Sequence, residues 1–269
     1  YLPAIGFLMI LAAALRHLLT AAKDPARRRR IGVAVLVAVL ALAAAESVAT
    51  RGQIARWQDS EGLYRYMLAL APRSARLHTV LGEILADQDR LDEAEDAYRR
   101  AIALNPAFSE AHGNLGIILA RQNRLDEAEA GFRDSLRLWP DNPRAHSNLA
   151  IVLASRGRLV DAISHFERSL KLKPHSSETH NNLANTLLRM ENTSEAMLHY
   201  REAIRLDPFN AEARYNLGYA LQTQGNPEAA AQAYREVLRI APGHLKAQQS
   251  LQQLRGGESS SPVPRSQPS

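Results

Sequence analysis

The chain has 269 residues, of which 46% are hydrophobic, a size and composition typical of a folded protein of one or two domains rather than a disordered chain. It contains no cysteine, which excludes disulfides, thiolate metal sites and cysteine nucleophiles. The formal net charge of +5 lies at the front, because residues 1–50 hold six basic and two acidic side chains whereas residues 75–244 hold 20 basic and 23 acidic ones, so the body is not expected to bind nucleic acid.

The first 50 residues predict two membrane-spanning helices. Residues 31–50, IGVAVLVAVLALAAAESVAT, carry one charge, Glu46, and 20 helical residues are long enough to cross a hydrocarbon core of about 30 Å. Residues 1–20 form a shorter apolar run, and because the chain begins at Tyr1 rather than at methionine we expect a fragment or a processed product. The loop at residues 21–30 holds five basic side chains, which predicts by the positive-inside rule that it is cytoplasmic.

This topology places everything after residue 50 outside the cytoplasm. The arginine- and alanine-rich composition suggests a bacterial chain, so we expect an integral protein of the inner (plasma) membrane with a periplasmic body. The alternative is a cleaved secretory signal peptide, with residues 31–50 as its apolar core and AAAES as its cleavage site. The apolar run before the basic loop and the length of the core favour two membrane helices.

Residues 75–244 repeat one pattern every 34 residues. The segments LHTVLGEIL, AHGNLGIIL, AHSNLAIVL, THNNLANTL and ARYNLGYAL align at this period, and each is followed by an alanine, by an aromatic residue four positions later and by a proline. Gly or Ala after the motif leucine permits close helix packing, the alanine and the aromatic residue share one helix face, and the proline ends the unit. We therefore predict five helix hairpins, at 75–108, 109–142, 143–176, 177–210 and 211–244.

This pattern resembles the tetratricopeptide repeat, in which two antiparallel helices recur every 34 residues. The resemblance implies an all-α fold, a right-handed α-solenoid of tetratricopeptide helix hairpins, preceded in this chain by the two transmembrane helices. The hexapeptide RLDEAE occurs at residues 90–95 and again at 124–129. We interpret it as the turn into the second helix of a hairpin, with acidic side chains in the first helical turn, where the helix dipole favours them.

Shorter segments extend the array at both ends. Residues 51–74 are predicted to form a linker and a half-repeat, because Tyr64 and Pro72 stand one period before the aromatic residue and the proline of the first unit. Residues 245–255 keep their leucines on one face and are predicted to form a capping helix. Residues 256–269 have no apolar periodicity, which predicts a disordered tail.

An asparagine precedes the motif leucine in four consecutive units, at Asn114, Asn148, Asn182 and Asn216, whereas the first unit has Val80. A side-chain amide offers a donor and an acceptor that match a peptide group, so a ladder of amides can hold a polypeptide main chain without reading its sequence. The arrangement is similar to the asparagine ladder of the O-linked N-acetylglucosamine transferase, a resemblance that implies peptide binding. The alternative is that these four asparagines form hydrogen bonds within the solenoid.

Histidine recurs at the same period, at His78, His112, His146 and His180. Equivalent side chains of successive repeats lie about two helix diameters, ~20 Å, apart, whereas the ligands of one zinc ion each lie ~2 Å from it. These histidines therefore cannot share a metal ion, and we interpret them as fillers of the helix interface. Arg144 with Asn148 resembles only in part the carboxylate clamp of chaperone-binding repeats.

The chain lacks GxSxG, phosphate-loop, HExxH and GxGxxG motifs, so no catalytic residue, metal or cofactor is predicted. The whole chain except the tail nevertheless resembles the C-terminal part of the transmembrane and tetratricopeptide repeat-containing O-mannosyltransferases and their bacterial relatives. The residues that carry this resemblance are YLPAIGF, the basic loop and RGQIARWQDSEGLYRYMLALAP, which runs into the repeats. This resemblance implies a multispanning membrane glycosyltransferase whose catalytic acid and donor-lipid contacts lie upstream of the residues present here.

Three functions are consistent with these features. We expect foremost a membrane-anchored repeat protein that binds a polypeptide on the extracytoplasmic side, as a scaffold or as the acceptor-recognition arm of a larger protein. The second is the C-terminal portion of a lipid-linked-sugar-dependent protein O-glycosyltransferase, and the third is a periplasmic assembly factor for envelope complexes. The expected partner in each case is a polypeptide in the concave groove that the first helices of such a solenoid line, with residues 1–50 in the membrane.

Overall fold

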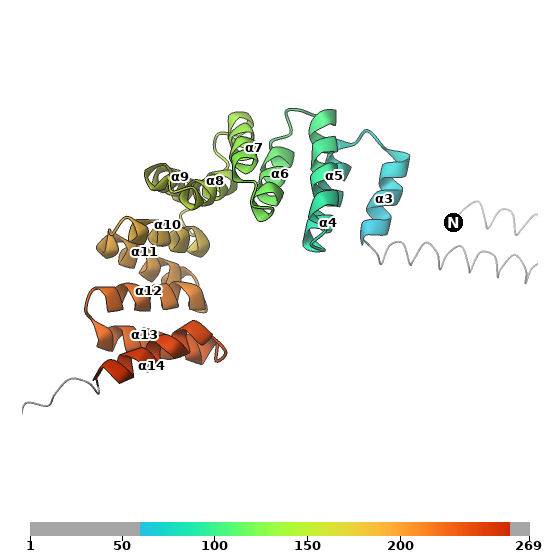
Figure 1. Cartoon of the computed structure of the whole chain (residues 1–269). Coiled ribbons are helices and arrows are strands. Elements are labelled where there is room, and N and C mark those ends of the chain that lie inside the picture. Colours follow the sequence, from blue (N-terminus) through green and yellow to red (C-terminus); the bar gives the residue numbers. More distant parts are fainter. Residues whose placement is uncertain (1–59, 259–269) are drawn as a thin grey trace, which may run out of the picture. The chain divides into compact units, whose positions relative to one another are not determined.

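The computed structural model describes residues 60–258, which form twelve α-helices and no strand (Figure 1). The predicted membrane helices and their basic loop lie outside the described residues, as do residues 259–269 of the predicted tail. The chain divides into two compact units after Ala69, and α3 (Ser60–Leu70) lies where the predicted half-repeat has its helix. Among the twelve helices, none has the length and apolar character that a bilayer span requires.

The second unit is a row of five helix hairpins. In each hairpin a first and a second helix pack along each other, and the second helix packs on the first helix of the next hairpin. The first helices are α4 (Ala75–Asp87), α6 (Ser109–Arg121), α8 (Pro143–Ser155), α10 (Ser177–Arg189) and α12 (Ala211–Thr223). The second helices are α5 (Leu91–Leu104), α7 (Leu125–Leu138), α9 (Leu159–Leu172), α11 (Thr193–Leu206) and α13 (Pro227–Ile240). The predicted all-α solenoid of tetratricopeptide hairpins is confirmed.

The turn inside each hairpin places one residue in the left-handed backbone region, two positions before the second helix. Gly157 and Gly225 adopt φ values of 79° and 77° there, which glycine reaches without steric cost. The other three hairpins use Asp89, Asn123 and Glu191 at φ values of 60° to 62°. The same reversal of the chain therefore recurs at every 34th residue, whichever side chain occupies it.

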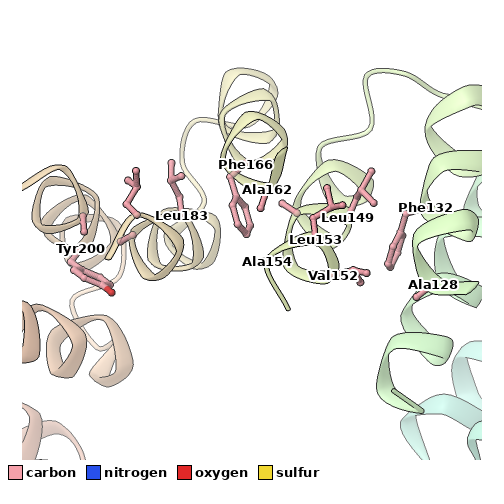
Figure 2. Packing of buried hydrophobic residues seen from close by; sticks show 14 of the residues in the cluster. Ala128, Phe132, Leu149, Val152, Leu153, Ala154, Ala162, Phe166, Leu183 and Tyr200 are labelled. Carbon is pink, nitrogen blue, oxygen red and sulfur yellow. The ribbon is translucent and has the colours of Figure 1, made fainter. Parts of the chain in front are cut away.

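The core of each hairpin pairs a large ring with a small residue of the first helix. Phe132 and Phe166 are each 1% exposed, and Figure 2 shows Phe166 in the row of buried residues beside Ala162, which belongs to the same second helix. A Cβ atom added at Gly116 would lie 2.9 Å from Cε1 of Phe132, closer than a carbon atom can pack. The small residue after the motif leucine therefore lies where the two helices pack closely, as predicted, and its neighbour there is the ring of Phe132.

The RLDEAE hexapeptide begins the second helices α5 and α7, as predicted, and it also joins neighbouring hairpins. The carboxylate of Glu95 is buried and accepts hydrogen bonds of 2.8 Å from Nη1 of Arg124, which belongs to the next copy. The carboxylate of Glu129 is likewise buried and accepts from Arg158 at 2.9 Å and from Arg156 at 2.5 Å. The last glutamate of each copy thus binds the arginine 29 positions later, which lies just before the next second helix. The sequence analysis did not predict this contact.

The C-terminal helix α14 (Leu245–Glu258) packs on α13. Its apolar side includes Ala247 and Leu251, which are 0% and 8% exposed and belong to a cluster with Tyr234 of α13. The helix extends three residues beyond the predicted end at residue 255, so the prediction that the tail is disordered from residue 256 is wrong for residues 256–258. Two glycines weaken a helix by about 1 kcal/mol each but, unlike proline, do not block it.

Candidate functional site

The first helices of successive hairpins contact one another, so α4, α6, α8, α10 and α12 share one surface, here called the first-helix face. The four predicted peptide-binding asparagines all lie on these helices, one position before the motif leucine. The structure divides them into two kinds, according to whether the amide has a partner within the solenoid.

Two of the four asparagines are engaged in contacts between hairpins. Asn114 is 6% exposed, and its Nδ2 donates to Oε1 of Glu83 on the preceding first helix at 2.9 Å. Asn216 donates from Nδ2 to Oδ1 of Asn185 at 3.0 Å and to Oδ1 of Asn181 at 3.2 Å. For these two side chains the alternative interpretation, hydrogen bonding within the solenoid, describes what the structure shows.

The other two asparagines are half-buried and available. Within residues 60–258, the side-chain amides of Asn148 and Asn182 make no hydrogen bond. The difference follows from the residue 31 positions earlier, on the preceding first helix. For Asn114 this residue is Glu83, which accepts its hydrogen bond. For Asn148 and Asn182 it is Ile117 and Ile151, whose side chains have no polar atom. Two adjacent hairpins therefore present free amides on the first-helix face, and the residue 31 positions earlier is the sequence signal that separates the two kinds.

Apolar and charged side chains surround the free amides. Ile151 and Tyr219 are 37% and 48% exposed on the same face, and Arg144 is exposed at the start of α8. A cavity of about 400 Å³ opens between α6, α7 and α8 and includes both Asn114 and Asn148 in its wall. The face therefore combines unpaired amides with exposed apolar surface, which is the composition of a site for a polypeptide rather than for an ion.

The recurring histidines hold the loops that join the hairpins. In each of the first four hairpins, Nε2 of this histidine lies 2.9 to 3.2 Å from the carbonyl oxygen of the proline six residues earlier. Since a carbonyl oxygen only accepts, Nε2 carries the proton and Nδ1 is left as an acceptor. Among residues 60–258 there is no group of three or more side chains able to hold a metal ion.

Two of these histidines meet a second histidine from the other helix of their hairpin. The Nδ1 atoms of His146 and His165 are 2.9 Å apart, and those of His180 and His199 are 3.0 Å apart. Because Nδ1 of His146 accepts, His165 donates from its own Nδ1, and a second proton on His146 would abolish this hydrogen bond. Burial lowers the pKa of His146, His165 and His199 below the ordinary value of 6.5.

We therefore expect the repeats to lose stability in acid. A histidine with a lowered pKa in the folded state binds protons more readily when unfolded, so the free energy of unfolding falls as the pH drops below 6.5. Thermal unfolding followed by circular dichroism between pH 7.5 and 5 measures this slope. The variant His165→Ala/His199→Ala removes the second ring of each pair and should show a shallower slope. An equal slope in both proteins would argue against the histidine pairs as its source.

The other buried titratable groups belong to the core. Burial raises the pKa of Tyr234 to about 12 and also raises the pKa of Tyr98 and Tyr200, so all three phenols are neutral near pH 7. Tyr200 donates to Oδ1 of Asn185 at 2.6 Å, and Tyr234 donates to Oε1 of Gln222 at 2.9 Å. Their perturbed pKa values therefore reflect packing of the hairpins, and nothing in residues 60–258 indicates catalysis.

Comparison with known proteins agrees with this fold. The family model described as Tetratricopeptide repeat matches residues 50–107, 88–143, 114–177 and 181–244, which together make up more than half of the chain. The chain belongs to the tetratricopeptide repeat family, whose members are in general binding scaffolds without enzymatic activity. No curated protein matches the chain in sequence.

Three solved structures illustrate the likeness of fold. YrrB, described as a TPR protein with an unusual peptide-binding site, is 21% identical with a TM-score of 0.57, over 70% of this chain and 97% of YrrB. PilF of Pseudomonas aeruginosa is 22% identical with a TM-score of 0.64, over 77% and 93% of the two chains. MamA is 18% identical with a TM-score of 0.56, over 62% and 97%. At these identities the likeness establishes the fold alone.

Proposed function

We propose that this chain binds an extended polypeptide along its first-helix face and that Asn148 and Asn182 hold the main chain of that polypeptide. The observation that carries the proposal is the pair of half-buried amides with no partner within residues 60–258, on adjacent hairpins of a tetratricopeptide array. An amide side chain can donate to a peptide carbonyl and accept from a peptide N–H at the same time. The unusual peptide-binding site of YrrB, a protein of the same fold, supports this use.

The expected affinity is modest. Hydrogen bonds contribute about 0.5 to 1.5 kcal/mol each, so two amides with two bonds apiece supply only a few kcal/mol. Main-chain capture by these residues alone corresponds to dissociation constants in the millimolar to micromolar range. Asn114 and Asn216 serve the proposal indirectly, since their bonds to the preceding first helix hold the spacing of the hairpins.

The variant Asn148→Ala/Asn182→Ala tests the proposal. With an unstructured nonapeptide of Gly and Ser carrying one central Ala as the probe, we expect binding to weaken by at least about tenfold in an NMR titration, because up to four hydrogen bonds are lost. The matched control is Glu167→Ala, which removes an exposed polar side chain from the second helix α9 and should leave the affinity unchanged. If the double variant keeps its fold and binds the peptide with unchanged affinity, Asn148 and Asn182 do not bind the peptide main chain.

For the residues before the repeats, we propose that segments 1–20 and 31–50 anchor the protein in the inner membrane and that the repeats lie on the extracytoplasmic side. The support is the 20-residue apolar run at residues 31–50 and the five basic side chains of the loop at residues 21–30. Extraction of membranes with alkaline carbonate tests the anchor: the chain should stay in the pellet, and release into the supernatant would contradict it.

The second candidate is the C-terminal portion of a protein O-glycosyltransferase that uses a lipid-linked sugar. It is favoured by the resemblance of YLPAIGF and RGQIARWQDSEGLYRYMLALAP to the O-mannosyltransferase family. In that case the peptide held on the first-helix face is the acceptor of the sugar. A coding region upstream of Tyr1 with many apolar spans would support this candidate. An initiator codon just before Tyr1 would instead favour the membrane-anchored scaffold.

A further inference from the structure

The cavity between α6, α7 and α8 lies at the junction of the second and third hairpins. Its volume is about 400 Å³, within the usual range of ligand pockets, and its apolar wall includes Ile117, Phe132 and Trp139. Trp139 is 53% exposed. Glu110 and Arg144 also line the cavity, both are exposed, and their opposite charges give no net preference for a charged ligand.

Gly113, the fifth residue of the second hairpin, lines this cavity and has no side chain to place in it. The same position in the other four hairpins is occupied by Thr79, Ser147, Asn181 and Tyr215. A Cβ atom built on Gly113 would lie 3.2 Å from Oγ of Ser135, so even the first carbon of a side chain would enter the space between α6 and α7. The cavity therefore adjoins a position of the repeat that carries no side chain in this hairpin.

The last hairpin shows what fills the equivalent position. Three periods, or 102 residues, after Gly113, Phe132 and Asn142 of the cavity wall stand Tyr215, Tyr234 and His244. The ring of Tyr215 packs between the other two, with centroid separations of 5.5 Å from Tyr234 and 5.1 Å from His244. These separations are typical of favourable aromatic pairs. The chain thus fills the equivalent junction with an aromatic ring of its own.

We infer that the cavity at Gly113 receives an aromatic side chain, Phe or Tyr, of the bound polypeptide. This inference rests on the proposed function and adds a side-chain preference to it. The guest ring takes the place that Tyr215 has in the last hairpin, against Phe132, with Trp139 beside it. Asn148 lines the same cavity, so a main chain held by that amide has a side chain within reach of the opening.

Two nonapeptides of Gly and Ser test the inference on the full chain, one with a central Phe and one with a central Ala. We expect the Phe peptide to bind about tenfold more tightly, since burial of an aromatic side chain is worth at least that factor. Trp139 reports the event directly: in Trp57→Phe it is the only tryptophan left, and its emission should change with the Phe peptide and not with the Ala peptide.

Gly113→Tyr supplies the ring from the chain itself, as in the last hairpin, and should reduce the preference for Phe over Ala to less than twofold. Gly113→Ser, which installs the side chain of Ser147, is the milder companion variant. Circular dichroism shows whether each variant keeps its helices. If Gly113→Tyr does not fold, two measurements on proteins that keep Gly113 still test the aromatic site: the ratio of affinities for the Phe and Ala peptides, and the emission of Trp139.

Equal affinity for the two peptides, or a preference that survives Gly113→Tyr, would overturn the aromatic site. These outcomes are separable from failure of the proposed function. If both peptides bind equally and Asn148→Ala/Asn182→Ala weakens both, main-chain capture stands and the cavity is not a subsite. If Gly113→Tyr abolishes the preference for Phe, but Asn148→Ala/Asn182→Ala binds both peptides as tightly as the unchanged protein does, the aromatic site stands and the amide proposal fails.

Discussion

Replacing Phe166 by alanine is expected to cost about 3 to 5 kcal/mol of folding free energy. The ring is 1% exposed and belongs to the buried cluster that extends from Leu119 to Ala220. The third hairpin, formed by α8 and α9, packs on a neighbouring hairpin at each end, so a cavity in it weakens two interfaces as well as its own core. Urea unfolding followed by circular dichroism measures the loss.

The matched control for this substitution lies on the same helix. Val160 is 69% exposed on α9, and Val160→Ala is expected to change stability by no more than about 0.5 kcal/mol. Hydrogen exchange should also show that Phe166→Ala lowers the protection of α8 and α9 most. Similar stability of the two variants would contradict the assignment of Phe166 to the core.

Gly116→Leu is expected to destabilise the protein by about 3 kcal/mol or more. A Cβ atom at Gly116 would meet Cε1, Cδ1 and Cζ of Phe132 at 2.9 to 3.1 Å, and leucine adds three further carbons in the same direction. Overpacking of this kind typically costs about 1 to 3 kcal/mol, and here the obstacle is a buried aromatic ring rather than the end of a flexible side chain. The thermal midpoint and the urea midpoint should both fall.

Two companion substitutions isolate the steric cause. Gly116→Ala should cost clearly less than Gly116→Leu, because its single added carbon needs only a small shift of the Phe132 ring and alanine favours a helix by about 1 kcal/mol over glycine. Ala150 and Ala184 stand at this position in the next two hairpins. Gly243→Leu is the control for added bulk, since a Cβ atom at Gly243 would have no atom within 4 Å. Equal losses for Gly116→Leu and Gly243→Leu would contradict the proposed clash.

The features that the sequence predicted well are those that depend on one hairpin alone. Small residues after the motif leucine recur at a constant spacing, which was enough to predict close packing of the two helices of one hairpin. The ring of Phe132 as the neighbour of Gly116 was not predicted. The contacts between hairpins were harder to foresee. The carboxylate of Glu95 binds Arg124, 29 residues later, and RLDEAE gave no sign of this partner when it was read as one turn.

The candidate site shows the same division. A period of 34 placed all four asparagines on one face, but their availability depends on the residue 31 positions earlier: Glu83 occupies Asn114, whereas Ile117 leaves Asn148 free. The cavity was not predicted. It is lined by residues of three helices, and Gly113, which adjoins it, belongs to no motif that the sequence shows. The membrane helices at residues 1–50 lie outside the described residues and stay a prediction.

The most direct test of the central claim, that the first-helix face binds a polypeptide, is hydrogen exchange of the full chain with and without a saturating Gly, Ser and Ala nonapeptide. We predict slower exchange in α8 and α10, which carry Asn148 and Asn182, with α9 and α11 unchanged. Slower exchange confined to the second helices, or none in α8 and α10 at saturation, would contradict the account.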